Sequence, residues 1–99
     1  MKKIINGKLY NTETAKEVLQ YNSGAKDSGQ YIETLYRKKT GEFFLQGEGD
    51  AASKYSESAG LNCRMAGSKI IPLTEKEVKQ YLENIDEPEI YMQYFEVEE

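Results

Sequence analysis

Two turn signals, each flanked by strand-forming residues, constrain this chain to fold around antiparallel hairpins. The first lies in "KIINGKLY", where Asn6-Gly7 supplies the two positive-φ positions of a type I′ turn. A two-residue loop of this kind pairs Ile5 with Lys8 and Ile4 with Leu9. Ile4 and Leu9 therefore share one face of the hairpin, and we expect that face to contact the core.

A second hairpin is predicted over residues 31–47, "YIETLYRKKTGEFFLQG". Its turn is "KKTG", with Gly41 in a left-handed position that produces a bulge. The returning strand contains Phe43, Phe44 and Leu45, three large apolar residues in succession. Such a run indicates a strand covered on both faces, or one covered on one face and used for association on the other. The second alternative predicts a homodimer.

A helix is predicted between the two hairpins, in "YNTETAKEVLQY". Asn11 can cap it, but Thr14 with Glu17 also matches a capping box, so two starting points remain open. The stripe of Ala15, Val18 and Leu19 has helical spacing. We expect this helix to end at a turn-rich loop of residues 21–30.

The strongest helical signal lies near the C-terminus, in "PLTEKEVKQYLENI". Thr74 and Glu77 form a capping box, and apolar residues follow at helical spacing. Pro88 suits the first turn of another helix. In that second helix an apolar stripe is expected to face the core, formed by Ile90, Tyr91, Tyr94 and Phe95.

Between these elements the pattern is weaker. Residues 51–58 are compatible with a short helical turn, and "KIIPL" is typical of a short strand in which Pro72 indicates a sheet edge or a strand end. The predicted fold class is α+β, with an antiparallel sheet, two hairpins and two to three short helices. A chain of 99 residues is expected to form a single domain, 1–99, with an acidic C-terminal helix or tail over residues 86–99.

Composition excludes several kinds of chemistry. The chain has no histidine and a single cysteine, Cys63, which removes Ser-His-Asp and Cys-His catalysis and histidine-ligated metal sites. No cofactor motif is present, and the loop "GEGDAAS" lacks the ending of a phosphate-binding loop. No apolar run is long enough to cross a membrane, so no membrane association is expected, and cysteine usage favours the cytoplasm.

Two groups of charged residues are candidates for binding. Glu48 and Asp50 could ligate a divalent ion or meet a partner, although two loop carboxylates are more often simply solvated. Arg37, Lys38 and Lys39 form a basic hairpin tip. With Tyr36 and Phe43 beside it, the tip could contact nucleic acid, or its charges could only keep the hairpin soluble.

The last quarter of the chain is strongly acidic. Residues 75–99 hold nine acidic and two basic residues, a net charge of −7, whereas residues 1–74 carry +3. The acids of the terminal stretch either form a solvated face or bind a basic surface on a partner. They are Asp86, Glu87, Glu89, Glu96, Glu98 and Glu99.

Three runs of sequence carry a family resemblance: "INGKLYNTETAKEV", "ETLYRKKTGEFFLQGEGD" followed by "SKY", and "IIPLTEKEVKQYLEN". They resemble small anti-CRISPR-type proteins of Firmicutes phages and mobile elements, which include inhibitors of Cas9. The resemblance covers about the first 85 residues, and Asp50 and the acidic tail lie outside the shared pattern. It implies a non-enzymatic protein that binds a CRISPR-Cas effector, Cas9 above all, or its guide-RNA complex. The alternative is a nucleic-acid-binding accessory protein of a phage or conjugative element.

Overall fold

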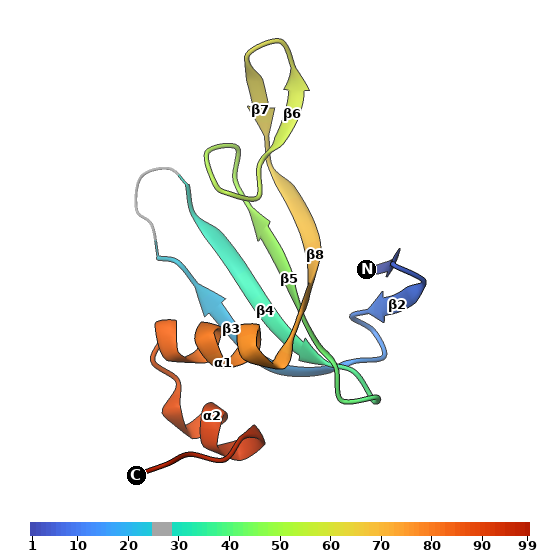
Figure 1. Cartoon of the computed structure of the whole chain (residues 1–99). Helices are drawn as coiled ribbons and strands as arrows, with labels where there is room; N and C mark the ends of the chain where they lie inside the picture. Colours follow the sequence, from blue (N-terminus) through green and yellow to red (C-terminus); the bar gives the residue numbers. More distant parts are fainter. Residues whose placement is uncertain (25–28) are drawn as a thin grey trace.

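A four-stranded antiparallel sheet forms the centre of the computed structural model, which describes residues 1–24 and 29–99. The strand order is β3-β4-β5-β8, from Lys16–Asn22, Tyr31–Arg37, Phe43–Gly49 and Gly67–Leu73. Two further hairpins flank it, β1-β2 (Lys2–Ile5 and Lys8–Asn11) and β6-β7 (Glu57–Gly60 and Cys63–Met65), and β6-β7 projects from one end (Figure 1). Helices α1 (Glu75–Asn84) and α2 (Pro88–Tyr94) complete an α+β fold, so the predicted class is confirmed.

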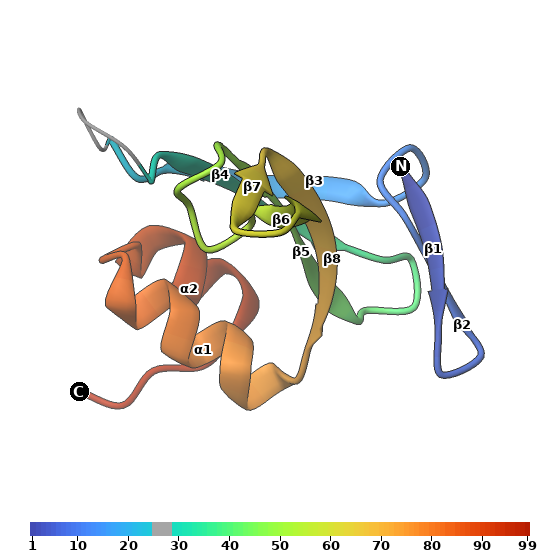
Figure 2. The ribbon, with the colours of Figure 1, turned by 90° about the horizontal axis from the view of Figure 1, so that it is seen from above.

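Both faces of the sheet are covered. The helices pack on one face, and the β1-β2 hairpin lies beyond the other (Figure 2). Phe43 and Leu45 join the core on the helical face, whereas Phe44 points to the opposite side and packs with Tyr10 and Ile70. All three residues of the Phe43–Leu45 run are buried, so the strand is covered on both faces. The homodimer stays a prediction, but the exposed apolar face that motivated it is absent at these residues.

The register of the first hairpin is confirmed, but its predicted core face is wrong. Ile4 pairs with Leu9 across the turn, yet their side chains are 71% and 49% exposed. The opposite face is the buried one, because Tyr10 meets the Phe44 ring edge-on at 5.4 Å. The turn fixes which residues pair, whereas the sheet on which the hairpin docks decides which face is buried.

The predicted helix after this hairpin is also wrong, because the segment forms one turn and then strand β3. The Asn11 side chain accepts a hydrogen bond from the Glu13 amide at 3.0 Å and closes a turn rather than capping a helix. A β-bulge at Val18 places Val18 and Leu19 together against the core that lies between the sheet and the two helices. Ala15 packs on the other side of the sheet. Of the predicted loop 21–30, residues 21–22 belong to β3, and residues 25–28 lie outside the described part of the chain.

Predictions for the C-terminal half are largely confirmed. The hydroxyl of Thr74 accepts from the Glu77 amide at 3.2 Å, and the Glu77 carboxylate accepts from the Thr74 amide at 2.9 Å. Pro72 lies in edge strand β8, and Pro88 begins α2, whose apolar stripe packs on the helical core. Residues 51–55 form turns instead of a helical turn, and they lead into the β6-β7 hairpin, which was not predicted.

Candidate partner-binding site

Among residues 1–24 and 29–99 the least exposed acidic residue is Glu33, a position that sequence reasoning did not single out. It lies on β4 with 2% of its surface exposed, and its carboxylate accepts hydrogen bonds from the hydroxyls of Tyr55 and, at 3.1 Å, Tyr81. Lys54 forms an ion pair with the same carboxylate at 2.8 Å. Strand β4, the loop after β5 and helix α1 therefore meet at one buried carboxylate.

The pKa values at this cluster show that Glu33 is held ionised. Burial by itself raises the pKa of Glu33, but the hydrogen bonds from Lys54, Tyr55 and Tyr81 outweigh burial and leave the pKa below its ordinary value. Burial first, and then the charge and hydrogen bond of Glu33, raise the pKa values of Tyr55 and Tyr81. Because three donors satisfy this carboxylate, it serves to join elements rather than to accept a proton from a substrate.

The "GEGD" segment, which ends strand β5 at Gly49 and continues to Asp50, has a structural role of the same kind. Gly47 lies against the Tyr55 ring and Gly49 against Ser53, so closely that a Cβ atom at either glycine would collide with these side chains. The Asp50 carboxylate accepts from the amides of Gly29, Gln30 and Ala52 at 3.0–3.2 Å. Its oxygens thus organise the backbone around it, and contact of Asp50 with a partner stays a prediction.

Glu48 was predicted to lie in a loop, but it belongs to strand β5, where it pairs with Ile32 and Ser68, and its side chain is exposed. Over residues 1–24 and 29–99, no three His, Cys, Asp or Glu side chains come together as metal ligands would. Across the same residues, neither helix is long and apolar enough to cross a membrane.

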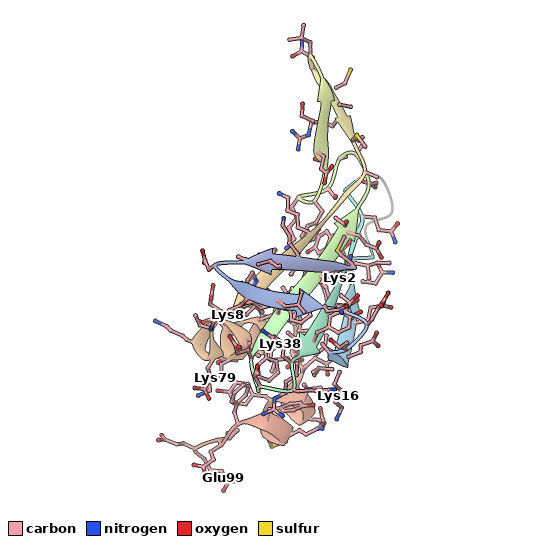
Figure 3. The ribbon with its side chains drawn as sticks, turned by 90° about the vertical axis from the view of Figure 1, so that its right-hand side faces the viewer. Lys2, Lys8, Lys16, Lys38, Lys79 and Glu99 are labelled. Atoms are coloured by element: carbon pink, nitrogen blue, oxygen red, sulfur yellow. The ribbon has the colours of Figure 1, made fainter. Side chains whose placement is uncertain are left out.

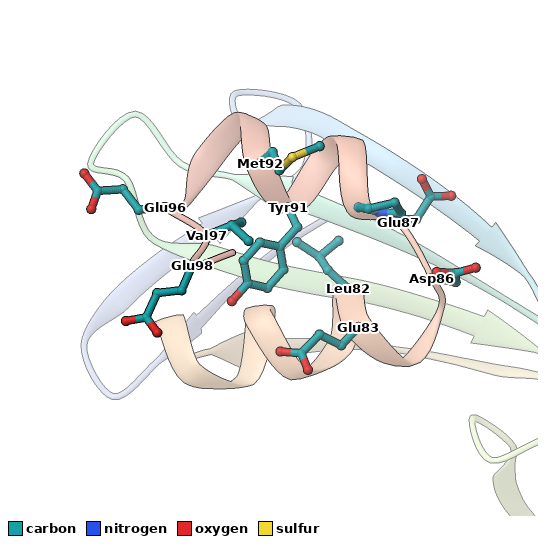
Figure 4. A pocket seen from close by; sticks show the side chains of 10 residues that line it. Leu82, Glu83, Asp86, Glu87, Tyr91, Met92, Glu96, Val97 and Glu98 are labelled. Carbon is teal, nitrogen blue, oxygen red and sulfur yellow. The ribbon is translucent and has the colours of Figure 1, made fainter.

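An open groove of about 600 Å³ lies between α1, α2 and the C-terminal tail, and we call it the acidic groove (Figure 4). Apolar residues form its floor: Leu82, Pro88, Tyr91, Met92 and Val97. Carboxylates form its rim: Glu83, Asp86, Glu87, Glu96 and Glu98. Four of the six predicted acids of the tail line it, whereas Glu89 and Glu99 do not, and Glu83 was missed.

Sequence order explains why this floor stays open. The stripe of Ile90, Tyr91, Tyr94 and Phe95 turns α2 toward the core, as expected, and Met92 is left 58% exposed on the other side. Val97 follows the helix and is 54% exposed. Asp86 adopts φ 57° at the junction of the helices, which turns the chain back so that the tail returns toward α1.

The acidic groove carries negative charge that no basic side chain in the described part of the chain neutralises. None of its five carboxylates forms an ion pair with a residue in the described part of the chain. Unpaired like charges around exposed apolar surface repel one another in the free protein. Binding of a positively charged, partly apolar segment would relieve that repulsion and cover the floor.

The basic hairpin tip presents its three cations differently. The Arg37 guanidinium lies over the rings of Phe43 and Tyr94, at 5.6 and 5.2 Å from their centroids. Lys38 pairs with Glu42 at 3.4 Å, and Lys39 is exposed. Phe43 is only 7% exposed, so its ring offers no face on which a nucleic-acid base could stack.

Comparison with known proteins adds no relative to this picture, since no family model, no curated protein and no solved structure matches the chain.

Proposed function

We propose that this protein is a non-enzymatic inhibitor that binds a CRISPR-Cas effector, with Cas9 as the foremost target, in the bacterial cytoplasm. The observation that carries the proposal is the acidic groove, in which unpaired carboxylates surround an exposed apolar floor. The motif runs that resemble anti-CRISPR-type proteins support the choice of target. Binding alone accounts for such a function, so no cofactor is needed.

The physical basis is competition for a positive surface. Cas9 holds its guide–target duplex in a positively charged channel that recognises backbone geometry. Carboxylates at the edge of a small protein can occupy the positions of phosphates there, and long-range attraction speeds the encounter. In this proposal Met92 and Val97 supply apolar contact, which favours a protein partner over a simple cation.

A non-enzymatic mode of action agrees with the kinds of side chain that the protein contains. The chain lacks histidine, and Glu33, its buried carboxylate, is engaged by three donors. The acidic residues of the groove rim are exposed or half-buried, so a partner surface can reach them directly.

The test is DNA cleavage by several Cas9 orthologues loaded with guide RNA, with and without a several-fold excess of the protein. We expect cleavage to be suppressed for at least one orthologue. Complete cleavage by every orthologue, at protein concentrations well above that of the enzyme, would refute the proposed function.

A matched pair of variants tests the groove separately. Asp86→Asn, Glu96→Gln and Glu98→Gln together remove three rim charges, and Asp86→Asn suits the positive φ because Asn tolerates it. The control, Glu13→Gln with Glu17→Gln and Glu57→Gln, removes three exposed charges elsewhere. The first variant should bind the effector more slowly and with a weaker salt dependence, whereas the control should match the parent. Equal behaviour of the two variants would exclude the groove as the contact surface.

A further inference from the structure

A second charged surface lies between the hairpin tip and the start of β3, and it has the opposite sign. Two adjoining hollows of about 330 and 240 Å³ share Thr14, Ala15, Lys38 and Lys39 in their walls. The larger hollow adds Lys16 and Arg37. We call the two hollows together the basic groove; within the described part of the chain, no carboxylate lines either of them.

The pairing of β3 with β4 brings two of these cations together. Lys16 and Arg37 are directly opposite one another across the two strands, on the same face of the sheet. Like charges at opposed positions destabilise a sheet, so the fold gains nothing from this pair. Over residues 1–24 and 29–99, Lys16, Arg37 and Lys39 form no ion pair, whereas Lys38 pairs with Glu42 at 3.4 Å.

The cations are also partly fixed in place. The rings of Phe43 and Tyr94 hold the Arg37 guanidinium on the helical face, whereas Lys38 lies 4.4 Å from the centroid of the Tyr10 ring, on the opposite side of the sheet. Lys16 and Lys38 lie toward the end of the molecule that carries the helices, away from the β6-β7 hairpin (Figure 3). Such an arrangement reduces the side-chain entropy that binding an anion would cost.

We propose that the basic groove binds the phosphodiester backbone of a nucleic acid. The cations reach the two adjoining hollows from both sides of the sheet, which suits successive phosphates of a polymer better than one small anion. Recognition is of the backbone and not of the bases, because Phe43 is buried and the half-buried Tyr36 ring is stacked on Phe44 at 5.2 Å. This site is independent of the acidic groove and does not rest on the proposed inhibition.

The test is fluorescence anisotropy of a labelled single-stranded RNA titrated with the full chain at several salt concentrations, beginning near about 50 mM. We expect salt-sensitive binding that does not depend on base sequence. The double variant Lys16→Gln/Lys39→Gln leaves the Arg37–Tyr94 contact in place. It should weaken binding roughly tenfold and reduce the slope of log affinity against log salt by about 1.4, since each phosphate contact to a single strand contributes about 0.7.

The matched control is Lys69→Gln/Lys76→Gln, which removes two exposed lysines outside the basic groove. It should bind RNA like the parent, and thermal unfolding of both variants should confirm that they are folded. Absence of salt-sensitive binding by the parent would overturn the proposal, and so would equal losses in the two variants. Displacement of the RNA by millimolar inorganic phosphate at constant ionic strength would overturn the assignment to a polymer backbone.

Discussion

Replacing Tyr81 by phenylalanine tests whether the buried carboxylate of Glu33 ties helix α1 to the sheet. The Tyr81 hydroxyl donates to Glu33 at 3.1 Å, and the change removes this bond while the ring stays in place. A hydrogen bond to a charged group contributes about 1.5–3 kcal/mol. Because no cavity forms, we expect Tyr81→Phe to lower the free energy of unfolding by about 2 kcal/mol.

Urea unfolding followed by far-ultraviolet circular dichroism measures this loss. For a domain of this size the denaturant dependence is about 2 kcal/mol per molar urea, so the midpoint should fall by about 1 M. Tyr21→Phe is the matched control, because the Tyr21 ring is half-buried and its hydroxyl makes no hydrogen bond within residues 1–24 and 29–99. The control should change stability by less than about 0.5 kcal/mol.

A double-mutant cycle with Glu33→Gln then isolates the role of the charge. Glutamine keeps the shape and one acceptor oxygen but loses the ionic component, so Tyr81→Phe should cost about 1 kcal/mol less in that background. Equal costs of Tyr81→Phe in the two backgrounds would refute the reasoning. A loss in Tyr81→Phe no larger than that in Tyr21→Phe would do the same.

Three further predictions follow from the same packing. The pKa of the Glu33 carboxyl is lower in the folded protein than in the unfolded chain. Its contribution to the free energy of unfolding is therefore present at pH values above the unfolded-state pKa and is lost as the pH falls through the folded-state pKa. When stability is measured as a function of decreasing pH, Glu33→Gln should lose less unfolding free energy than the parent. Gly47→Ala should destabilise by at least about 2 kcal/mol, measured as a lower thermal midpoint, because a Cβ atom would displace the Tyr55 ring from Glu33. Thr74→Ala should cost about 1 kcal/mol of unfolding free energy in the same assay, since it removes the cap of α1.

The parts of the fold that sequence predicted correctly are those decided by near neighbours. The Asn6-Gly7 turn fixed the register of its hairpin, and Gly41 adopts the positive φ that the second hairpin required. The capping box of Thr74 and Glu77 placed α1 to within a residue. In each case the deciding contacts span only a few positions of the chain.

The failures have a physical reason in contacts between distant residues. The helical spacing of Ala15, Val18 and Leu19 arises from a bulged strand whose residues serve both sides of the sheet. Pairing with β4 outweighed the helical propensity of the segment, because the strand gains a full hydrogen-bonded neighbour. Local pattern cannot distinguish a bulge from a helical turn when only two turns of sequence are available.

The candidate sites were predictable to different degrees. The aromatic stripe alone predicts that the acidic residues of the C-terminal segment point away from the core. The apolar floor of the acidic groove could not be predicted in this way, because it depends on how the tail folds back toward α1. Lys16 could not be connected with the hairpin tip, because the pairing that joins it to Arg37 spans a segment predicted to be helical. Glu33 and Tyr81 are 48 positions apart, and nothing in their local sequence marks them as partners.

The proposed kinship with anti-CRISPR-type proteins rests on motif runs that include residues which hold this fold together. Glu33 and Tyr55 form the buried cluster, Gly47 makes room for the Tyr55 ring, and Thr74 caps α1. The acidic tail lies outside the shared pattern, and the basic groove depends on Lys16, which no local motif marks as a site residue. A protein could therefore keep all the residues that hold this fold together and still bind a different target. The groove variants accordingly decide between possible partners more sharply than any substitution within the shared motifs.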